Sequence, residues 1–247
     1  MNVLLIDAAD VTPDGLVTLS PLPATHVRQV LRASEGDDIR VGVIDGAMGI
    51  ATVTALAPDR VELRCTFDDV IPARPRVDVL LALPRPKVMR RLWAQLAAMG
   101  VGHVMLTNAE KVERDYFDSH VLQPEGYGPL LIEGLQQARD TRVPLVSIHK
   151  RFKVLVEDLL DAIAPDCRRL VAHPGADLTI REALCDMAAD ERVLLAIGPE
   201  GGWNHFELDL LQAHGFTPVG LGPRTLATTT ACIALLALTH DAIGSHP

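Results

Sequence analysis

The sequence predicts an α/β protein in which a small β-rich domain precedes a larger domain built on a mostly parallel sheet. Apolar, β-branched runs separated by turn-forming pairs fill the first part of the chain. From Val77 onward, short apolar runs alternate with helical periodicity, which is typical of a parallel sheet covered by helices on both faces. The pattern changes within residues 70–75, where Pro72 and Pro75 interrupt it. We therefore predict two domains, residues 1–72 and residues 73–247.

The first domain is predicted to contain three strands and one helix. The strands are expected at residues 38–44, 50–56 and 60–67, and the pairs Asp45-Gly46 and Pro58-Asp59 are expected to form the turns between them. The helix is expected near residues 24–32, with an apolar face that carries Val27, Val30 and Leu31. Its opposite face carries His26, Arg28 and Arg32. Short strands around one core favour a small barrel.

The second domain is predicted to alternate strands and helices. Strands are expected at residues 77–83, 103–107, 145–149, 168–172, 192–197 and 217–221, and helices at 86–99, 126–139, 153–164, 179–189, 204–214 and 228–243. Capping boxes at Thr179-x-x-Glu182 and Asn204-x-x-Glu207 mark two of the helix starts. Because ligands of such sheets bind beyond the carboxyl ends of the strands, the loops that follow strands are where chemistry is expected.

Composition excludes several functional classes. Nothing in the sequence resembles a secretory signal or approaches the length of a membrane helix, so we expect a cytoplasmic protein with no membrane association. The four cysteines lie far apart and are expected to be free thiols, and the nine histidines show no metal-binding spacing, so no metal site is expected. Gly100-Val101-Gly102 precedes a strand and lacks a third glycine, which argues against a dinucleotide-binding loop.

The charge pattern permits RNA binding only through local patches. A net charge of −9 argues against indiscriminate binding of nucleic acid by the whole surface. Basic residues nevertheless gather between Arg74 and Arg91 and between Arg139 and Lys153. Charge alone favours two solvated faces, and RNA binding is the alternative interpretation.

Three loops rich in glycine and proline follow strands in the last third of the chain. They begin at His173, Gly198 and Gly222, and the second and third lead directly into helices. Glycine lets backbone N–H and C=O groups approach a ligand closely, which suits recognition of an adenine ring. The alternative is three ordinary turns.

Two of these loops contain the segments Ile197-Gly198-Pro199-Glu200-Gly201-Gly202 and Leu221-Gly222-Pro223-Arg224-x-Leu226. Together these segments resemble the signature of the bacterial 16S ribosomal RNA (uracil-N3) methyltransferases, which belong to the SPOUT superfamily of trefoil-knotted enzymes. Residues 26–32 with Gly36-Asp37 are similar to the family's N-terminal PUA-like barrel. Gln137-Ala138-Arg139-x-x-Arg142-Val143-Pro144 is similar to its central segment, and Ala172-His173-Pro174 to its first cofactor loop.

The resemblance implies a knotted methyltransferase domain that takes a methyl group from S-adenosylmethionine and transfers it to uridine N3 of 16S ribosomal RNA. It implies ribosomal RNA or the small ribosomal subunit as partner, and a homodimer, which the apolar residues Ile233, Leu235, Leu236 and Leu238 of the last helix also suggest. The implied cofactor-binding residues are Ala172, His173, Pro174, Ile197, Gly198, Glu200, Gly201, Gly202, Leu221, Gly222, Leu226 and Thr230.

Arg224, Glu200 and Arg139 are the candidate catalytic residues. Arg224 is expected to stabilise negative charge on the uracil or to hold a phosphate, and a structural ion pair is the alternative. Glu200 is expected to orient the cofactor or accept a proton, and fixing the loop is the alternative. Arg139, with Arg142, is expected to face the RNA backbone, the alternative being a solvated helix end. Trp203 is expected to pack under its loop rather than to stack on a base.

The chain departs from the family pattern at three places. Ala227-Thr228-Thr229-Thr230-Ala231 stands where the family has Arg-Thr-Glu-Thr-Ala, so one arginine and one glutamate are missing. Gln95-x-x-Ala98-Met99-Gly100 replaces Lys-x-x-Glu-Leu-Gly, and Gln136 replaces an acidic residue. These departures leave two alternatives open: a SPOUT methyltransferase with another RNA target, including ribose 2′-O, and a non-catalytic RNA-binding relative.

Overall fold

The computed structural model describes residues 2–57 and 60–244 and divides into two compact units. The first unit contains Met1–Arg74 and Pro129–Val143, and the second contains Pro75–Gly128 and Pro144–Pro247. The structure therefore adds to the first unit a segment that lies far along the chain from the rest of it. The turn predicted at Pro58-Asp59 lies outside the described residues.

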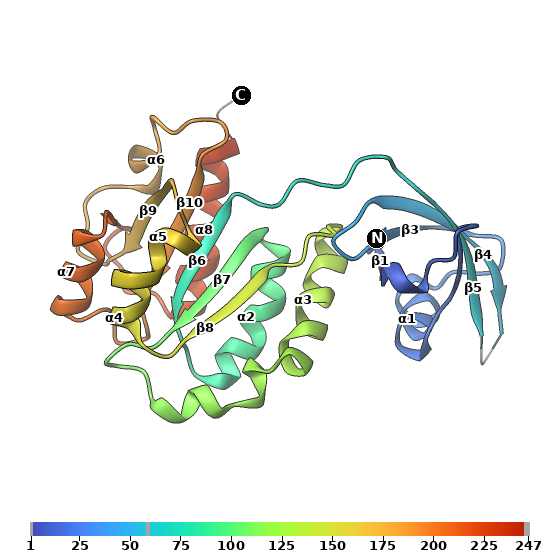
Figure 1. Cartoon of the computed structure of the whole chain (residues 1–247), viewed down its shortest axis with the longest axis horizontal. Coiled ribbons are helices and arrows are strands. Elements are labelled where there is room, and N and C mark those ends of the chain that lie inside the picture. The colour runs from blue at the N-terminus through green and yellow to red at the C-terminus, as the bar shows by residue number, and fades with distance from the viewer. Residues whose placement is uncertain (1, 58–59, 245–247) are drawn as a thin grey trace. The chain divides into compact units, whose positions relative to one another are not determined.

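The first unit is built on a five-stranded mixed sheet in the order β1-β3-β4-β5-β2 (Figure 1). Strand β1 runs parallel to β3, and the other neighbouring pairs are antiparallel. Because β1 and β2 are the two edges, the sheet is a curled half-barrel and not a closed barrel. The strands are β1 (Leu4–Ile6), β2 (Leu16–Thr18), β3 (Asp38–Val43), β4 (Met48–Leu56) and β5 (Val61–Phe67).

One helix covers the core of this sheet. Helix α1 (Pro21–His26) continues into a π-helical turn at Val27–Leu31 and ends at Arg32, which is left-handed with φ 53°. Val27 is fully buried among strand residues, and Leu31 packs against the same core. Val30 is 53% exposed, so the sequence prediction was wrong for this residue. The π turn is wider than an α-helical turn and shifts the residues that face the core.

The second segment of the first unit is joined to the sheet by hydrogen bonds. It contains the end of helix α3 (Pro124–Ala138) and the residues that follow it. The N–H of Val3 donates to the carbonyl of Gln136 at 3.0 Å. Thr141, which is fully buried, donates from Oγ1 to the carbonyl of Gly46 at 2.6 Å, and its own carbonyl accepts from the N–H of Asp45 at 2.8 Å.

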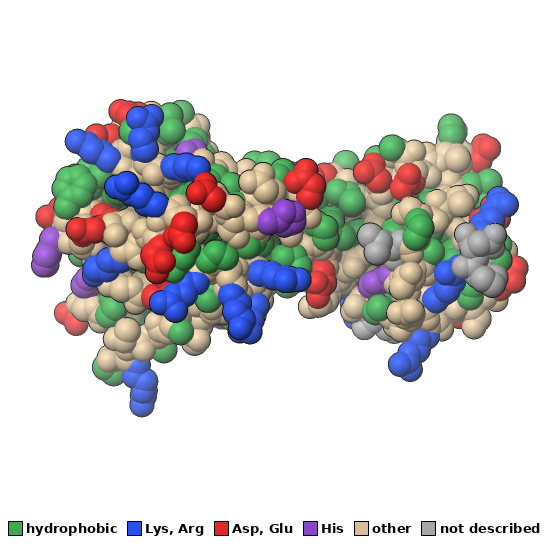
Figure 2. All heavy atoms as spheres, turned by 90° about the horizontal axis from the view of Figure 1, so that it is seen from below, with side chains coloured by type: hydrophobic (Ala, Val, Ile, Leu, Met, Phe, Trp, Pro, Cys, Tyr) green, Lys and Arg blue, Asp and Glu red, His purple; other side chains and the backbone are tan. Residues whose placement is uncertain are grey.

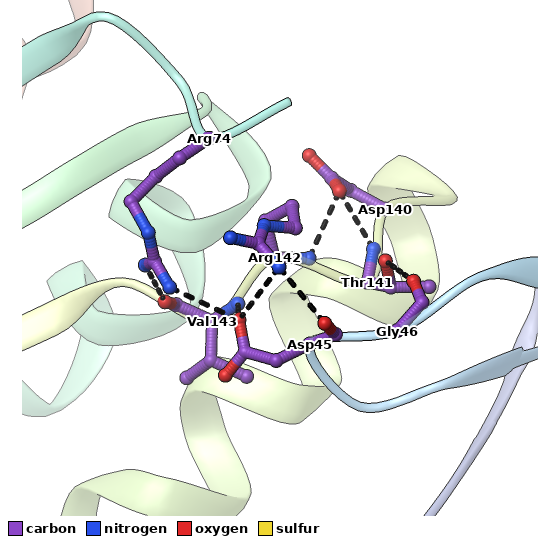
Figure 3. Close-up of polar contacts among 7 residues, drawn as sticks. All are labelled: Asp45, Gly46, Arg74, Asp140, Thr141, Arg142 and Val143. Atoms are coloured by element: carbon purple, nitrogen blue, oxygen red, sulfur yellow. Dashed lines mark hydrogen bonds and ion pairs between the residues drawn. The ribbon is translucent and has the colours of Figure 1, made fainter. Parts of the chain in front are cut away.

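The carboxylate of Asp45 accepts hydrogen bonds both from Arg74 and from the residues that follow helix α3 (Figure 3). Its Oδ1 accepts from Arg74 Nη2 at 3.2 Å and from the N–H of Val143 at 3.2 Å. Arg142 Nη1 donates to the carbonyl of Asp45 at 2.8 Å, and Arg74 Nη1 donates to the carbonyl of Val143 at 2.7 Å. Arg74 and Arg142, which the sequence placed in basic patches, are thus ion-paired and hydrogen-bonded inside the first unit.

The second unit is built on a six-stranded parallel sheet, as the sequence predicted, in the order β11-β9-β10-β6-β7-β8. Its strands are β6 (Val77–Ala82), β7 (Val101–Thr107), β8 (Leu145–His149), β9 (Cys167–Ala172), β10 (Arg192–Ile197) and β11 (Thr217–Val219). Every residue of β6 is buried, including Asp78, which accepts two hydrogen bonds from Arg192 at 2.7 and 3.1 Å. Pro218 is tolerated because β11 is an edge strand.

Helices cover both faces of this sheet (Figure 1). Helices α2 (Pro86–Ala98) and α8 (Thr228–Gly244) pack together on one face. The opposite face carries α4 (Phe152–Val154), a π-helical turn (Leu155–Leu159), α5 (Leu160–Ile163) and α7 (His205–Ala213). Short 3-10 helices, η3 (Arg114–Asp118) and η4 (His120–Leu122), follow β7.

The predicted helix bounds of the second domain lie within two residues of the observed ones, except at the end of one helix. Both capping boxes are present, at Thr179 and at Asn204, each with side chain and backbone bonds in both directions. Helix α6 (Ile180–Ala183) nevertheless stops after four residues, whereas the sequence predicted a helix to residue 189. A capping box fixes where a helix begins but carries no information on where it ends.

Candidate functional site

A cavity of about 260 Å³ opens where strands β9, β10 and β11 end. The three loops that follow these strands form most of its wall, and the first turns of α8 complete it through Thr228, Ala231 and Leu235. The cavity is lined by eleven of the twelve residues that the sequence marked for a cofactor: Ala172, His173, Pro174, Ile197, Gly198, Glu200, Gly201, Gly202, Leu221, Gly222 and Leu226. The three loops predicted from the sequence therefore converge on one cavity.

Thr230 does not line the cavity. Residues 228, 231 and 235 share one face of helix α8, because positions three, four and seven apart lie along the same side of a helix. Thr230 falls outside this spacing and is exposed. The resemblance to a family motif indicated the segment that contains Thr230, but it did not indicate which face of helix α8 lines the cavity.

The second loop is held in shape by contacts from both sides. Gly202 has φ 70° and donates its N–H to the carbonyl of Pro199 at 2.8 Å. Lys111, from the loop after β7, donates from Nζ to the carbonyl of Gly201 at 2.6 Å. A Cβ at Gly198 would lie 3.2 Å from the backbone nitrogen and from Nε1 of Trp203. The loop is thus closely packed on its inner side.

Trp203 packs under this loop, as the sequence indicated. It is 8% exposed, and its ring lies 5.3 Å from that of Phe152, centroid to centroid. Its indole Nε1 is buried and has no hydrogen-bond partner among the described residues. A buried unpaired donor in the wall of a cavity is a place where a ligand acceptor would be stabilised.

The first and third loops lie against each other. The N–H of His173 donates to the carbonyl of Val219 at 3.0 Å, and the N–H of Gly220 donates to that of Leu178 at 2.9 Å. A Cβ at Gly220 would lie 2.2 Å from the carbonyl oxygen of Ala176, so only glycine fits there. His173 Nδ1 accepts from the N–H of Gly175 at 3.1 Å and thereby holds its own turn.

Arg224 and Glu200 both line the cavity and both are exposed. Within residues 2–57 and 60–244, no ion pair involves either side chain, so the ion pair considered for Arg224 is not formed there. Lys111, and not Glu200, fixes the second loop. Arg139 belongs to the first unit and has a left-handed backbone with φ 60°. It is not a lining residue of the cavity.

Sequence reasoning missed Lys111 as a site residue and overestimated the first basic patch. Lys111 lies ninety residues from its partner, and no local pattern signals such a contact. Arg76 donates to the backbone carbonyls of Ala189 and Ile243, so it is structural. Arg85, Lys87, Arg90 and Arg91 remain exposed around the start of α2.

The part of the chain that the structure describes also bears on metal binding and membrane insertion. It holds no group of three or more His, Cys, Asp or Glu side chains that could bind a metal ion. None of its helices combines the length and apolar character that crossing a membrane requires.

The fold and the cavity together define a class of protein. Residues 72–240 match the model of the RNA methyltransferase domain family, and the chain belongs to that family. It is 28% identical over 254 residues to the ribosomal RNA small subunit methyltransferase E of Treponema pallidum, a match that covers 97% of this chain and 92% of the relative. The enzyme of the same name from Synechocystis is 26% identical over 96% of this chain and 77% of its own length.

A solved structure shares the fold along nearly the whole chain. The ribosomal RNA small subunit methyltransferase E of Neisseria gonorrhoeae, crystallised with S-adenosyl methionine, superposes with a TM-score of 0.78. The superposition covers 98% of this chain and 97% of the other, at 19% sequence identity.

Proposed function

We propose that this RNA methyltransferase transfers a methyl group from S-adenosylmethionine to ribosomal RNA of the small subunit, at uridine N3. The observation that carries the proposal is the cavity formed by the three loops after β9, β10 and β11. The relatives from Treponema and Synechocystis carry the name of a small-subunit ribosomal RNA methyltransferase and align with almost the whole chain. The activity belongs in the cytoplasm, where ribosomal RNA is assembled into subunits.

The residues of the cavity fit the proposed cofactor. At Gly202 and Gly222, which have φ values of 70° and 89°, a Cβ would meet nothing within 4 Å, so backbone there is open to a ligand. The unpaired indole nitrogen of Trp203 offers a further donor. When bound, S-adenosylmethionine supplies a methyl group on a sulfonium, which is activated for displacement. Backbone of the second and third loops would hold its adenine end, and the first loop would close the cavity.

The protein's own side chains would position the uracil and balance its charge. Uracil N3 carries a proton that must leave for the nitrogen to act as a nucleophile. Arg224 would stabilise the negative charge that develops on the uracil, because a guanidinium donates several hydrogen bonds from a fixed plane. Glu200 stands on the facing loop as the candidate proton acceptor. Arg139 would contact the RNA backbone.

Three features of architecture belong to the same proposal. The last three loops are threaded as a trefoil knot, as the resemblance to the methyltransferase family implies. Residues 1–72, completed by Pro129–Val143, act as a PUA-like RNA-binding domain, and the remainder of residues 73–247 acts as the methyltransferase domain. The protein acts as a homodimer that uses the exposed side of α8, where Leu238 is 47% exposed.

Nucleoside analysis of ribosomal RNA tests the proposal. Small-subunit RNA from cells that lack the gene should contain no 3-methyluridine at the target, and incubation of those subunits with protein and S-adenosylmethionine should restore it. A 2′-O-methylated nucleoside in its place would show a different target. Cofactor binding without any methylated product would identify a non-catalytic relative and contradict the proposal.

A further inference from the structure

A second cavity, of about 450 Å³, lies in the second unit beside the first. Its walls come from the loop after β7, the start of α4 and the start of α7. The residues that decide its chemistry are Asn108, Glu110, Arg114, Lys153, Phe206 and Glu207. Of these, the sequence indicated only Lys153, as the end of the second basic patch, and Glu207, as part of a capping box.

The interior of this cavity is polar but not cationic. Asn108 carries a buried Oδ1 that accepts no hydrogen bond from the described residues. Glu207, 4% exposed, accepts from the N–H of Glu110 at 2.7 Å and from that of Asn204 at 2.9 Å. Glu110 in turn accepts from Asn204 Nδ2 at 2.6 Å. The buried carboxylate of Glu207 disfavours a bare anion inside, whereas the free oxygen of Asn108 favours a neutral group that donates an N–H.

Other lining residues are aromatic or positively charged. Phe206 is 56% exposed, although a large aromatic side chain would normally be buried. Arg114 is exposed and forms no ion pair with any described residue, and Lys153 reaches only Glu157, at 3.7 Å. Figure 2 shows lysine and arginine side chains spread between acidic ones over a face of the second unit. An exposed aromatic ring beside cations is the combination that binds an unpaired base and its phosphate.

The two cavities share a wall. Phe152 lines the second cavity and packs its ring on Trp203, which lines the first. Asn204 follows Trp203 directly in the chain, and Lys111, in the β7 loop, holds Gly201. A nucleotide in the second cavity would therefore lie close to the loop proposed to bind the methyl donor.

We infer that the second cavity binds one unstacked nucleotide of the RNA substrate. The base contacts Phe206 and Asn108, and Arg114 and Lys153 bind the phosphate. This inference rests on the proposed function, because it takes RNA as the substrate. It adds a subsite that positions RNA next to the methylated nucleotide.

Binding of a fluorescein-labelled hexauridylate to the full chain, followed by fluorescence anisotropy at several salt concentrations, tests the inference. Phe206→Ala should weaken binding about tenfold, because stacking on an aromatic ring is lost, and Phe206→Trp should restore it. Arg114→Gln should lower the salt slope of the binding constant by roughly 0.7, whereas Arg114→Lys should keep it. Uridine monophosphate should displace the probe, and inorganic phosphate should not.

The outcomes separate this subsite from the proposed function. Phe206→Ala should leave affinity for S-adenosylmethionine and the melting temperature unchanged, while it raises KM for small subunits. Equal hexauridylate affinity in the unaltered protein and Phe206→Ala overturns the inference, as does displacement by inorganic phosphate alone. Absence of 3-methyluridine, with hexauridylate binding that follows the pattern above, overturns the proposed function and leaves the nucleotide subsite standing.

Discussion

Single residues of the first cavity allow a test of cofactor binding that avoids its glycines. Valine at Gly201 would bring its Cβ within 2.6 Å of the Lys111 side chain, so it would disturb the loop as well as the cavity. Ala231 lies on a regular helix and lines the cavity. Ala231→Leu should therefore fill the space without backbone strain and weaken S-adenosylmethionine binding at least tenfold, about 1.4 kcal/mol.

Calorimetry measures this effect, and Ala213→Leu is the matched control. Ala213 is exposed at the end of α7 and does not line the cavity, so its variant should bind the cofactor normally. If Ala231→Leu binds S-adenosylmethionine as tightly as the Ala213→Leu control, the cofactor does not occupy this cavity.

Residues 227–229 depart from the family pattern, and this difference predicts slow methylation. Thr228 is buried at the start of α8, whereas Ala227 is exposed beside the cavity. Neither alanine nor threonine can neutralise a uracil anion or accept its proton, so we expect normal cofactor affinity with slow methylation. The double change Ala227→Arg with Thr229→Glu should raise kcat for 3-methyluridine formation at least tenfold. Fast turnover by the unaltered protein, with no gain in the variant, would show that the loop does not need these charges.

Site residues could be predicted from the sequence where the residues that form the site are close together in the chain. They were missed where a contact joins distant segments. The loops of the first cavity were predicted because each follows a strand and is rich in glycine and proline, and the residues within them were indicated by the family resemblance. Lys111 and Phe152 were not, because each reaches the second loop from a distant segment. Arg74 and Arg142 were misread since their partner Asp45 lies in a turn that showed no sign of the contact.

At the scale of elements, half-buried histidines predict how the free energy of unfolding depends on pH. Burial lowers the pKa of His240 on helix α8, and it lowers the pKa of His26 and His149 as well. The unfolded chain therefore binds more protons than the folded one near pH 6. Stability should be full above about pH 6.5 and fall as the pH drops below it.

Urea titrations between pH 5 and pH 8 measure this dependence. His240→Gln removes one of the groups that must take up a proton on unfolding, so its stability should fall less steeply below pH 6.5 than that of the unaltered protein. Identical pH dependence in the two proteins would show that His240 does not contribute.

The predicted dimer depends on the apolar residues of helix α8. The structure shows that some of these residues are buried and that one is exposed. Leu235 and Leu236 are fully buried in the core, so they cannot serve an interface, whereas Leu238 is 47% exposed. Leu238→Glu should therefore yield monomers of 26.7 kDa at micromolar concentration while the fold persists. Leu159→Glu, at an exposed site on the other face of the sheet, is the control. Light scattering that finds the unaltered protein monomeric would contradict the dimer.

Elements of the second unit were easier to predict than those of the first. All six strands of its sheet were located, because each follows or precedes a segment with helical periodicity. Strands β1 and β2 were missed because three residues are too few to show an alternating pattern and, unlike the equally short β11, they do not stand between two predicted helices. The π-helical turn at Val27–Leu31 misled the assignment of Val30, since sequence periodicity assumes an α-helix.

At the scale of the whole molecule, the discontinuous first unit predicts that residues 1–74 will not fold alone. Without residues 129–143, the N–H of Val3, the N–H of Asp45 and the carbonyl of Gly46 lose their partners. Each of these hydrogen bonds contributes on the order of 1 kcal/mol, and together they are a substantial part of the stability of a small domain. Proton NMR should show poorly dispersed signals for the fragment and dispersed ones when residues 129–143 are attached through a flexible linker. A well-folded 1–74 fragment would contradict this.

The hydrogen bonds of Thr141 and the Asp45 carboxylate also have a consequence for biosynthesis. The ribosome delivers all five strands of the first unit before it reaches the segment that completes them, which ends at Val143. Because synthesis proceeds at about 5–20 residues per second, the half-barrel spends on the order of ten seconds without the hydrogen-bond partners of Gly46 and Val3. During that interval the nascent chain exposes an unfinished sheet, so this protein should depend on chaperones that meet chains as they emerge.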